Sequence, residues 1–343
     1  MADILTVDRL KAYYLMNYYG VSREVRAVDD VTMSVRQNEI YGIAGESSSG
    51  KTSFIKVLAA AVRPPLKVVD GGVVYRFGDR TIDVSRARPA EIEAIRWKNL
   101  SYIMQGSMSV LNPVRRIEHI FEDFAARPLG LRGTALRAQV TEHLGRLQLG
   151  PEVLRAYPHE LSGGMRQRVT IGLATICNPQ MIIADEPTTA LDVVVQKDVL
   201  SLIRKLQAEM GSSVIFVTHD MAVHANMADR VGIVYAGRLI EEAPTRTLFV
   251  APKHPYTAHL VASLPRIGDT TRRPALDGRP PNLANPPSGC RFHPRCPLAI
   301  DKCRTNVPPL VEVAPQQRSA CWRWQDVVPL PGSISGSRVE AHA

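Results

Sequence analysis

The stretch GESSSGKT, residues 45–52, decides how this chain is expected to fold. It fits the pattern G-x-x-x-x-G-K-[ST], in which small residues allow backbone N–H groups to surround an anion. The apolar run EIYGIA before it predicts a strand, and KTSFIKVLAAAVR at its end has the spacing of a helix. A strand, a tight loop and a helix N-terminus together predict a phosphate-binding loop. An ordinary Gly/Ser loop is the alternative for this motif taken alone.

The lysine and the hydroxyl side chains of this stretch have defined roles in such a loop. Lys51 is expected to reach the β- and γ-phosphates of a nucleotide, and the Thr52 hydroxyl to bind Mg²⁺. The residues expected to surround the phosphates are Gly45, Ser47, Ser49, Gly50, Lys51, Thr52 and Ser53.

A second motif supplies carboxylates. The stretch MIIADEPTTALD, residues 181–192, begins as a buried strand and continues into adjacent acids. Because such sheets bind ligands at the carboxyl ends of their strands, Asp185 is expected to hold Mg²⁺ through water, and Glu186 to polarise the water that attacks the γ-phosphate. The apolar run SSVIFVT ends in the same way at His219, which is expected to contact the γ-phosphate. Surface acids and a structural histidine are the alternatives for these residues taken singly.

Composition limits the class of protein. With 343 residues, 45% of them apolar, the chain can form one large core, or one core and a smaller module. It has no apolar run near the ~18 residues of a membrane-spanning helix, and its first residues, MADILTVDRLKAYY, carry acids where a signal peptide is basic. We therefore expect a cytoplasmic protein. The net charge of +9 suits nucleotides, nucleic acid or an anionic membrane surface and does not choose among them.

The stretch LSGGMRQRVTIGLATICNPQ, residues 161–180, resembles the signature motif of ATP-binding-cassette (ABC) ATPases. By this resemblance Gln105, in YIMQ, belongs to the Q-loop, which contacts Mg²⁺ and couples the nucleotide to a membrane partner. Asp192, in TALD, belongs to the D-loop, and His219 is the switch histidine. The ordered set of motifs implies a complete nucleotide site.

The resemblance also implies a dimer. Two cassettes of this family enclose two ATP molecules, so Ser162, Gly163 and Gly164 are expected to bind the nucleotide of a partner subunit. An aromatic residue stacks on adenine in this family, and the position falls on Tyr14, with Tyr13 as the alternative one register away.

Three positions depart from the usual pattern of the family, and one of them is Gly106, which follows Gln105 where an acid is common. Ser48 stands where glycine is usual, and its Cβ is expected to cost some nucleotide affinity. Asn38 replaces the glycine of a turn, and because asparagine tolerates left-handed backbone conformations we expect that turn to be intact.

The implied fold is α/β. Residues 1–250 are expected to form an ABC-type nucleotide-binding domain, with a RecA-like core, an antiparallel β-subdomain and a helical subdomain at about 91–180. Residues 251–328 are expected to form a small C-terminal metal-binding module, and residues 329–343 a flexible tail.

The segment KHPYTAHLVASLPRIG, residues 253–268, resembles the one that follows the cassette in oligopeptide and dipeptide importers. Together with YPHELSGGMRQR, residues 157–168, it points to the first of the two ATPase subunits of such a system.

Cysteines cluster in the same region. Four of the five lie between residues 290 and 321, and a reducing compartment disfavours disulfides. Four thiolates suit a soft metal centre, and the absence of a C-x-x-C pair disfavours a zinc ribbon. The resemblance implies that Cys290, Cys296, Cys303 and Cys321 bind a [4Fe–4S] cluster, with zinc as the alternative. Simply buried thiols are a third possibility, which the low apolar content of the segment disfavours.

The function implied is the ATP-hydrolysing subunit of an importer, bound peripherally to the cytoplasmic face of the inner membrane. Its expected partners are a second ABC ATPase subunit, two transmembrane permease subunits and an extracytoplasmic solute-binding protein. Peptides are the first choice of solute, oligosaccharides the second, and nickel a further alternative.

Two other classes are weighed. A soluble ABC ATPase acting on DNA or ribosomes would show long coiled-coil insertions or two cassettes in one chain, and the sequence has neither, so no nucleic-acid partner is expected. A cassette without activity would lack part of the set Lys51, Thr52, Gln105, Asp185, Glu186 and His219, and all six are present.

Overall fold

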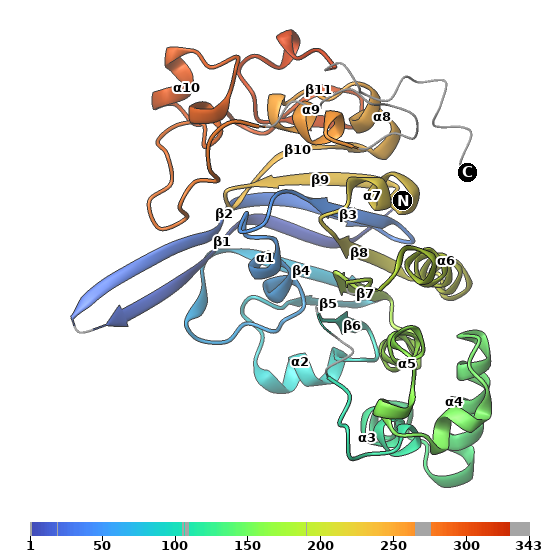
Figure 1. The fold of residues 1–343 in the computed structure, drawn as a ribbon. Coiled ribbons are helices and arrows are strands. Elements are labelled where there is room, and N and C mark those ends of the chain that lie inside the picture. Colours follow the sequence, from blue (N-terminus) through green and yellow to red (C-terminus); the bar gives the residue numbers. More distant parts are fainter. Residues whose placement is uncertain are drawn as a thin grey trace.

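A mixed sheet runs through the middle of the molecule (Figure 1). The computed structural model of the chain describes residues 2–18, 20–104, 106, 110–189, 191–264 and 276–329. The strands of this sheet are β3 (Ile40–Ala44), β6 (Leu100–Ile103), β7 (Met181–Asp185), β8 (Ser213–Val217), β9 (Arg230–Tyr235), β10 (Arg238–Pro244), β11 (Val311–Ala314) and β12 (Gln317–Ser319). Their order is β11-β12-β10-β9-β3-β8-β7-β6. Strands β3, β6, β7, β8 and β9 run parallel, and β10, β12 and β11 continue the sheet by antiparallel pairing.

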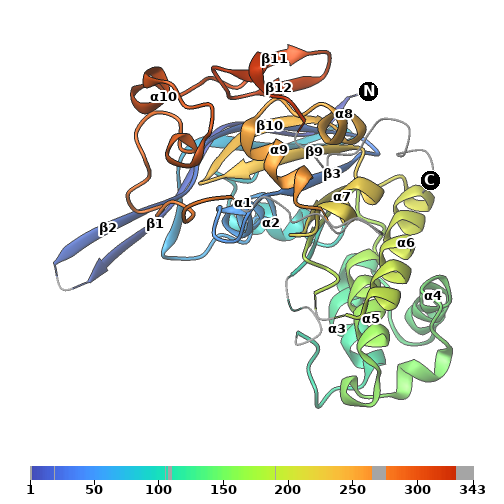
Figure 2. The same cartoon turned by 45° about the horizontal axis from the view of Figure 1, so that its top comes forward.

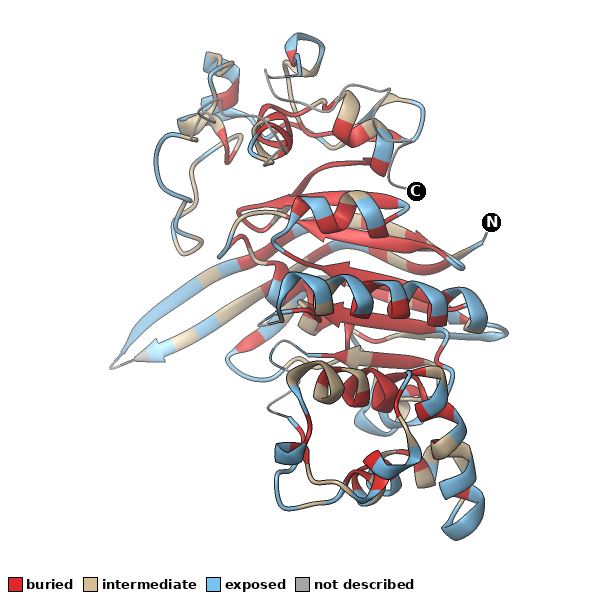
Figure 3. Cartoon of the chain, turned by 45° about the vertical axis from the view of Figure 1, so that its right-hand side comes forward, coloured by how far each residue is buried: buried red, intermediate tan, exposed pale blue. Residues whose placement is uncertain are grey.

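The parallel strands are short apolar runs that are buried on both faces, as parallel sheets require. Every residue of β3, β7, β8 and β9 is buried. Helices α1 (Lys51–Leu58), α6 (Val193–Met210) and α7 (Met221–Met227) follow β3, β7 and β8. Figure 3 shows the buried strands behind the half-exposed α6. The strand, loop and helix predicted around residues 45–52 are therefore present.

A second, antiparallel sheet packs against α1. It consists of β1 (Asp3–Tyr18), β2 (Val21–Arg36), β4 (Leu66–Phe77) and β5 (Arg80–Asp83), in the order β2-β1-β4-β5. Its buried face shares one apolar cluster with Phe54 and Leu58 of α1. The far end of the β1–β2 hairpin projects from the body of the molecule and is exposed (Figure 3).

Helices gather on the opposite side of the main sheet. They are α3 (Ile117–Leu129), α4 (Gly133–Arg146) and α5 (Gly163–Thr175), joined by the 3₁₀ turns η2 (Pro151–Arg155) and η3 (Pro158–Glu160), with α2 (Pro89–Ile95) before them. Their apolar faces meet in one cluster that includes Phe121, Leu144 and Val169. Figure 2 shows this group of helices at one end of the molecule. Among the described residues, none of the helices has the length and apolar character needed to cross a membrane.

The C-terminal residues pack at the edge of the main sheet that ends in β11, whereas β6 forms the opposite edge. Helices α8 (Thr245–Val250) and α9 (Pro255–Ala262) lead into this region, which also holds η4 (His293–Arg295), α10 (Asp301–Thr305) and η5 (Trp324–Asp326). Strand β12 pairs with β10, so these residues extend the main sheet. Phe292 of this segment is 1% exposed and lies in an apolar cluster made mostly of residues from β9, β10, α7 and α8. The segment contributes few apolar residues to this cluster, among them Tyr256 and Phe292, and packs them against the cassette. The predicted tail at 329–343 lies, from residue 330 on, outside the described residues.

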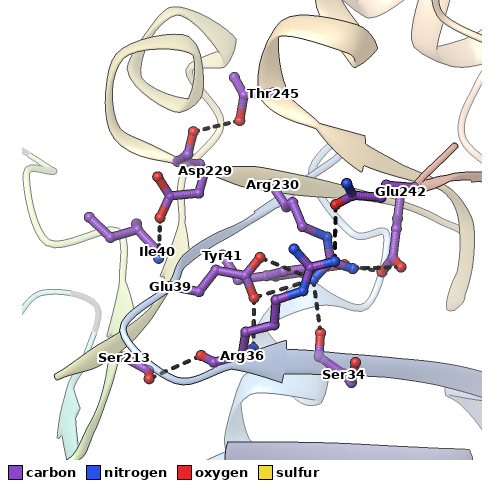
Figure 4. Close-up of polar contacts among 12 residues, drawn as sticks. Ser34, Arg36, Glu39, Ile40, Tyr41, Ser213, Asp229, Arg230, Glu242 and Thr245 are labelled. Carbon is purple, nitrogen blue, oxygen red and sulfur yellow. Dashed lines mark hydrogen bonds and ion pairs between the residues drawn. The ribbon is translucent and has the colours of Figure 1, made fainter. Parts of the chain in front are cut away.

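A buried polar network ties four strands of the main sheet together (Figure 4). Arg230 on β9 is 7% exposed and donates to Glu39 at 3.0 and 3.2 Å and to Glu242 on β10 at 2.8 Å. The Tyr41 hydroxyl of β3 donates to Glu242 at 2.7 Å, and Arg318 on β12 donates to the same carboxylate at 2.9 Å. The C-terminal strand is thus joined to the main sheet by charge as well as by backbone pairing.

Candidate functional site

The loop between β3 and α1 has a backbone that only small residues allow. Gly45 has φ 149 and Gly50 has φ 100. A Cβ at Gly45 would overlap the carbonyl oxygen of Val234, and one at Gly50 would overlap that of Ala27. Ser48 takes a left-handed conformation with φ 63, which shows why glycine is usual there. The Asn38 turn, with φ 60, forms as expected.

Lys51 lies under this loop. It is 4% exposed, and its ammonium group donates to the carbonyl oxygens of Gly45 at 2.6 Å and Glu46 at 2.7 Å. Burial lowers the pKa of Lys51 to about 8, although the neighbouring carboxylates of Glu186 and Asp185 favour its charge. The Lys51 ammonium group is therefore held against the loop backbone and interacts with the carboxylates of Asp185 and Glu186.

The hydroxyl residues of the loop divide into buried and exposed ones. Ser47 and Thr52 are exposed, whereas Ser49 and Ser53 are buried. The Ser53 hydroxyl is 3.0 Å from the hydroxyl of Tyr14, the residue expected to stack on adenine. Tyr14 is half-buried on β1, and its hydroxyl reaches Ser53 in the first turn of α1.

The two predicted acids follow β7. Asp185 is 1% exposed, and the Tyr102 hydroxyl donates to one of its oxygens at 3.4 Å. The other oxygen, Oδ1, is buried and has no hydrogen-bond partner in the described part of the chain. Burial, followed by the charge of Glu186, raises the pKa of Asp185 to about 6. A buried carboxylate oxygen without a partner beside a lysine is a position at which a cation can bind.

Glu186 and His219 meet at the ends of neighbouring strands. The His219 ring contacts the Glu186 carboxylate, and the Thr189 hydroxyl donates to the same carboxylate at 2.9 Å. The backbone at Glu186 is left-handed, with φ 48, and its N–H donates to Val217 of β8 at 2.9 Å. Sequence reasoning missed Tyr102 and Thr189, because no spacing distinguishes them from ordinary strand and loop residues.

The signature residues lie elsewhere in the chain. Ser162 is exposed and caps α5, where its hydroxyl accepts from the N–H of Met165 at 3.3 Å. Gly163 and Gly164 form the first turn of α5, and Figure 2 shows that α5 and α1 lie in different parts of the molecule. Asp192 caps α6 and is also exposed. Gln105 lies outside the described residues.

Comparison with known proteins decides the family. The ABC transporter family matches residues 28–189, and the C-terminal region of oligopeptide/dipeptide transporters matches residues 240–303. A putative peptide import ATP-binding protein of Brucella ovis is 42% identical over 325 residues, which cover 89% of this chain and 94% of the relative. The chain belongs to the ABC transporter ATPases.

Other relatives agree with this assignment. The dipeptide transport ATP-binding protein DppD of Caldanaerobacter subterraneus is 36% identical, over 96% of this chain and all of the relative. Among solved structures, the dimeric ATP-binding cassette MJ0796, in a post-hydrolysis state bound to ADP and Pi, superimposes with a TM-score of 0.59 and 25% identity. That alignment covers 70% of this chain and 98% of the other.

This ABC ATPase has a groove between its sheet and its helices. Two adjoining cavities of about 1350 and 580 Å³ share the lining residues Arg96, Trp97 and Phe124. Met104, which precedes Gln105, lines the smaller cavity and is 42% exposed, and Val110 at its rim is 48% exposed. The groove therefore presents apolar surface beside the predicted Q-loop.

The four clustered cysteines of this ABC ATPase line one cavity of about 10 Å³, and all four are free thiols. Burial raises the pKa of Cys296 to about 11 and that of Cys321 to about 12, so these thiols are neutral at physiological pH. In the described residues no group of three or more potential ligands is arranged to hold a metal ion. The cavity has room for about one water-sized atom. The predicted metal centre is therefore not preformed in this structure.

Proposed function

We propose that this chain binds ATP at residues 45–52 and hydrolyses it to energise a peptide importer. The observation that carries the proposal is the meeting of Lys51, Asp185, Glu186 and His219 at the carboxyl ends of the adjacent parallel strands β3, β8 and β7. Peptides are proposed as the solute because relatives that match nearly the whole chain are named for peptide and dipeptide transport.

In this proposal the residues of the chain divide the work of phosphate chemistry. The loop amides and Lys51 bind the phosphates, and Tyr14 stacks on adenine. Glu186 takes the proton of the attacking water, and His219 and Thr189 hold its carboxylate in place. Mg²⁺, when bound, neutralises charge on the phosphates, and Asp185 and Thr52 are the residues that would hold it, with Gln105 as a further candidate. The partnerless buried oxygen of Asp185 supports that assignment.

The site is proposed to be completed by a second ATPase subunit. Ser162, Gly163, Gly164 and Asp192 would serve the nucleotide of that subunit, since Ser162 and Asp192 cap helices at exposed positions. Val193 and Val194, which follow Asp192, are 82% and 72% exposed, so this surface is apolar and suits a protein contact. A solved relative is itself a dimer of cassettes.

The permease subunits are proposed to dock in the groove beside Met104 and Val110. The groove is lined by residues of the strands and of the helical region. If ATP binding moves the helical region relative to the strands, a permease helix bound in the groove would move with it. The chain is proposed to lie on the cytoplasmic face of the membrane, with the solute-binding protein on the other side. Residues 1–250 would act as the nucleotide-binding domain and 251–328 as its C-terminal module.

The Glu186→Gln variant tests the assignment of the catalytic base. The amide keeps the shape of the side chain but cannot accept the proton, so turnover should fall at least about 100-fold while ATP binding persists. Size-exclusion chromatography of the variant together with the second ATPase subunit, ATP and Mg²⁺ should then reveal a stable cassette dimer. Steady-state hydrolysis near the wild-type rate would remove Glu186 from this role.

A metal centre at the four cysteines is a separate proposal that rests on their donor chemistry and shared cavity. A [4Fe–4S] cluster does not fit the cavity as it stands, because the cavity has room for about one water-sized atom. Metal analysis of anaerobically purified protein should therefore find iron or zinc in the wild type and none in Cys296→Ser. Purification of both proteins without metal would withdraw this proposal and leave the ATP site untouched.

A further inference from the structure

The phosphate-binding loop contacts the C-terminal part of the chain through Glu46, a residue to which the sequence assigns no role. The Glu46 backbone N–H donates to the hydroxyl of Tyr256 on α9 at 2.8 Å. Its carboxylate receives two hydrogen bonds from Arg295, from Nη1 at 2.8 Å and from Nη2 at 3.0 Å. Arg295 thus holds the side chain of Glu46, and Tyr256 holds its backbone. Both residues lie in the C-terminal part of the chain, beyond residue 250.

This contact is withdrawn from solvent and is itself supported. The Arg295 side chain is 7% exposed, the Glu46 side chain 26%, and Tyr256 is fully buried. Arg295 also donates to the carbonyl oxygen of Asp277 at 3.0 Å and to the Tyr235 hydroxyl at 3.2 Å. Tyr235, Tyr256 and Phe292 pack ring against ring, with centroids 4.6 to 5.5 Å apart. A paired, bidentate arginine–carboxylate contact in such a setting is among the stronger polar interactions in proteins.

The other end of the loop is held from the same segment, residues 290–296. Arg291 donates to the carbonyl oxygen of Ala236 and pairs with Asp29. The next residue in that turn, Gly237, donates its N–H to the carbonyl oxygen of Ser49 at 2.7 Å. Two arginines of one short segment therefore support the beginning and the end of the loop.

We propose that Arg295 and Tyr256 are positioning residues of the ATP site, a role that rests on the proposed function. Neither is among the residues expected to surround the phosphates. They fix the peptide at Glu46, whose carbonyl oxygen accepts from Lys51, so both sides of this residue are held. Because loop amides bind phosphate only when they point inward together, freedom at Glu46 weakens nucleotide binding. The C-terminal segment is thus a part of the ATP site.

The test measures the Kd of Mg²⁺-ATP for the full-length chain, with a fluorescent ATP analogue as probe. Arg295→Gln should raise the Kd about tenfold, because it removes a charged bidentate contact. Arg295→Lys should recover part of the affinity, since one ammonium group can still reach the carboxylate. The matched control is Arg304→Gln, whose side chain is 66% exposed on α10 and which should bind ATP as the wild type does.

A double-mutant cycle separates positioning from a general structural role. Glu46→Gln should raise the Kd as Arg295→Gln does, and the combination should cost little more than either change alone. Tyr256→Phe, which removes one hydroxyl from a packed ring, should weaken ATP binding in the same direction. In steady-state assays of the assembled importer these variants should raise KM more than they lower kcat. The melting temperature without nucleotide identifies any variant that fails to fold.

Lys51→Ala distinguishes the failure of this inference from the failure of the proposed function. If Lys51→Ala still binds ATP normally, the site itself is misassigned. If Lys51→Ala loses binding while both Arg295→Gln and Tyr256→Phe keep the wild-type Kd, only the positioning role is overturned. Additive effects of Glu46→Gln and Arg295→Gln would also overturn it.

Discussion

Single residues of the site adopt left-handed backbone conformations that side chains with a Cβ rarely take. Ser48 has φ 63 and Glu186 has φ 48. The left-handed backbone at Glu186 coincides with the contact of its carboxylate to His219, and strained backbone conformations are often found at active sites. Ser48 makes no side-chain hydrogen bond within the described part of the chain, so a substitution there can remove the steric cost of its conformation.

Ser48→Gly should raise the free energy of unfolding by up to about 1 kcal/mol, because glycine adopts this conformation without steric cost. Urea denaturation of the full-length chain without nucleotide measures the change. Ser47→Gly is the matched control: its backbone is not left-handed, and the added freedom of the unfolded chain should lower stability instead. The same sign for both substitutions would contradict the steric explanation.

At the scale of elements, the sequence predicted those whose signal is local. The strand before residues 45–52, the helix after it and the strand that ends at Asp185 all occur as expected. Asp185, Glu186 and His219 were predicted at strand ends, and Lys51 at the start of a helix, because local apolar runs fix those positions. The contacts of Tyr256 and Arg295 with Glu46 could not be predicted, since they join residues about 210 and 249 positions apart. The places of β11 and β12 in the sheet were equally unpredictable, because β12 pairs with β10, which lies far from it in the sequence.

The network around Arg230 is expected to stabilise the sheet through charge pairing. Arg230→Met leaves the Glu39 carboxylate buried without its guanidinium and should lower the free energy of unfolding by about 3–5 kcal/mol. Arg9→Met, at a side chain that is 70% exposed, should change it by less than about 0.5 kcal/mol. Chemical denaturation measures both. Equal effects of the two substitutions would show that the buried network contributes nothing specific.

The groove between sheet and helices makes a prediction about assembly. Val110→Asp adds a charge to its apolar rim and should reduce copurification of the permease subunits about tenfold or more. Val311→Asp is the matched control, because Val311 is 45% exposed on β11, at the other edge of the sheet. Normal recovery of permeases with Val110→Asp would exclude the groove as their docking site.

At the scale of the whole molecule, the C-terminal segment and the cassette share one core and one sheet. Glu241 on β10 is fully buried where they meet, and it accepts from the N–H of Lys253 at 2.6 Å and from Gln317 of β12 at 2.9 Å. Burial raises the pKa of Glu241 to about 7 from its ordinary 4.5. The folded protein therefore keeps a proton that the unfolded chain releases between these values.

The sign of the resulting pH dependence follows from this proton. The contribution of Glu241 to the free energy of unfolding is complete below about pH 4.5. This contribution, on the order of 2 kcal/mol, is lost as the pH rises through about 7. Buried His143 and His224, whose pKa values burial lowers to about 4, act in the opposite direction between about pH 4 and 6.5. The comparison of Glu241→Gln with the wild type by urea denaturation at pH 5 and pH 8 isolates the glutamate. An unchanged difference between the two pH values would show that Glu241 does not titrate in this range.

The central claim is that ATP hydrolysis at this site drives the import of peptides. The most direct measurement is the uptake of a labelled peptide by proteoliposomes that contain this chain, the second ATPase subunit and the permeases, with the solute-binding protein added. Uptake should require ATP and stop when Glu186 is replaced by Gln. Peptide uptake that persists with Glu186→Gln, or uptake of an oligosaccharide or nickel in place of peptides, would contradict the account.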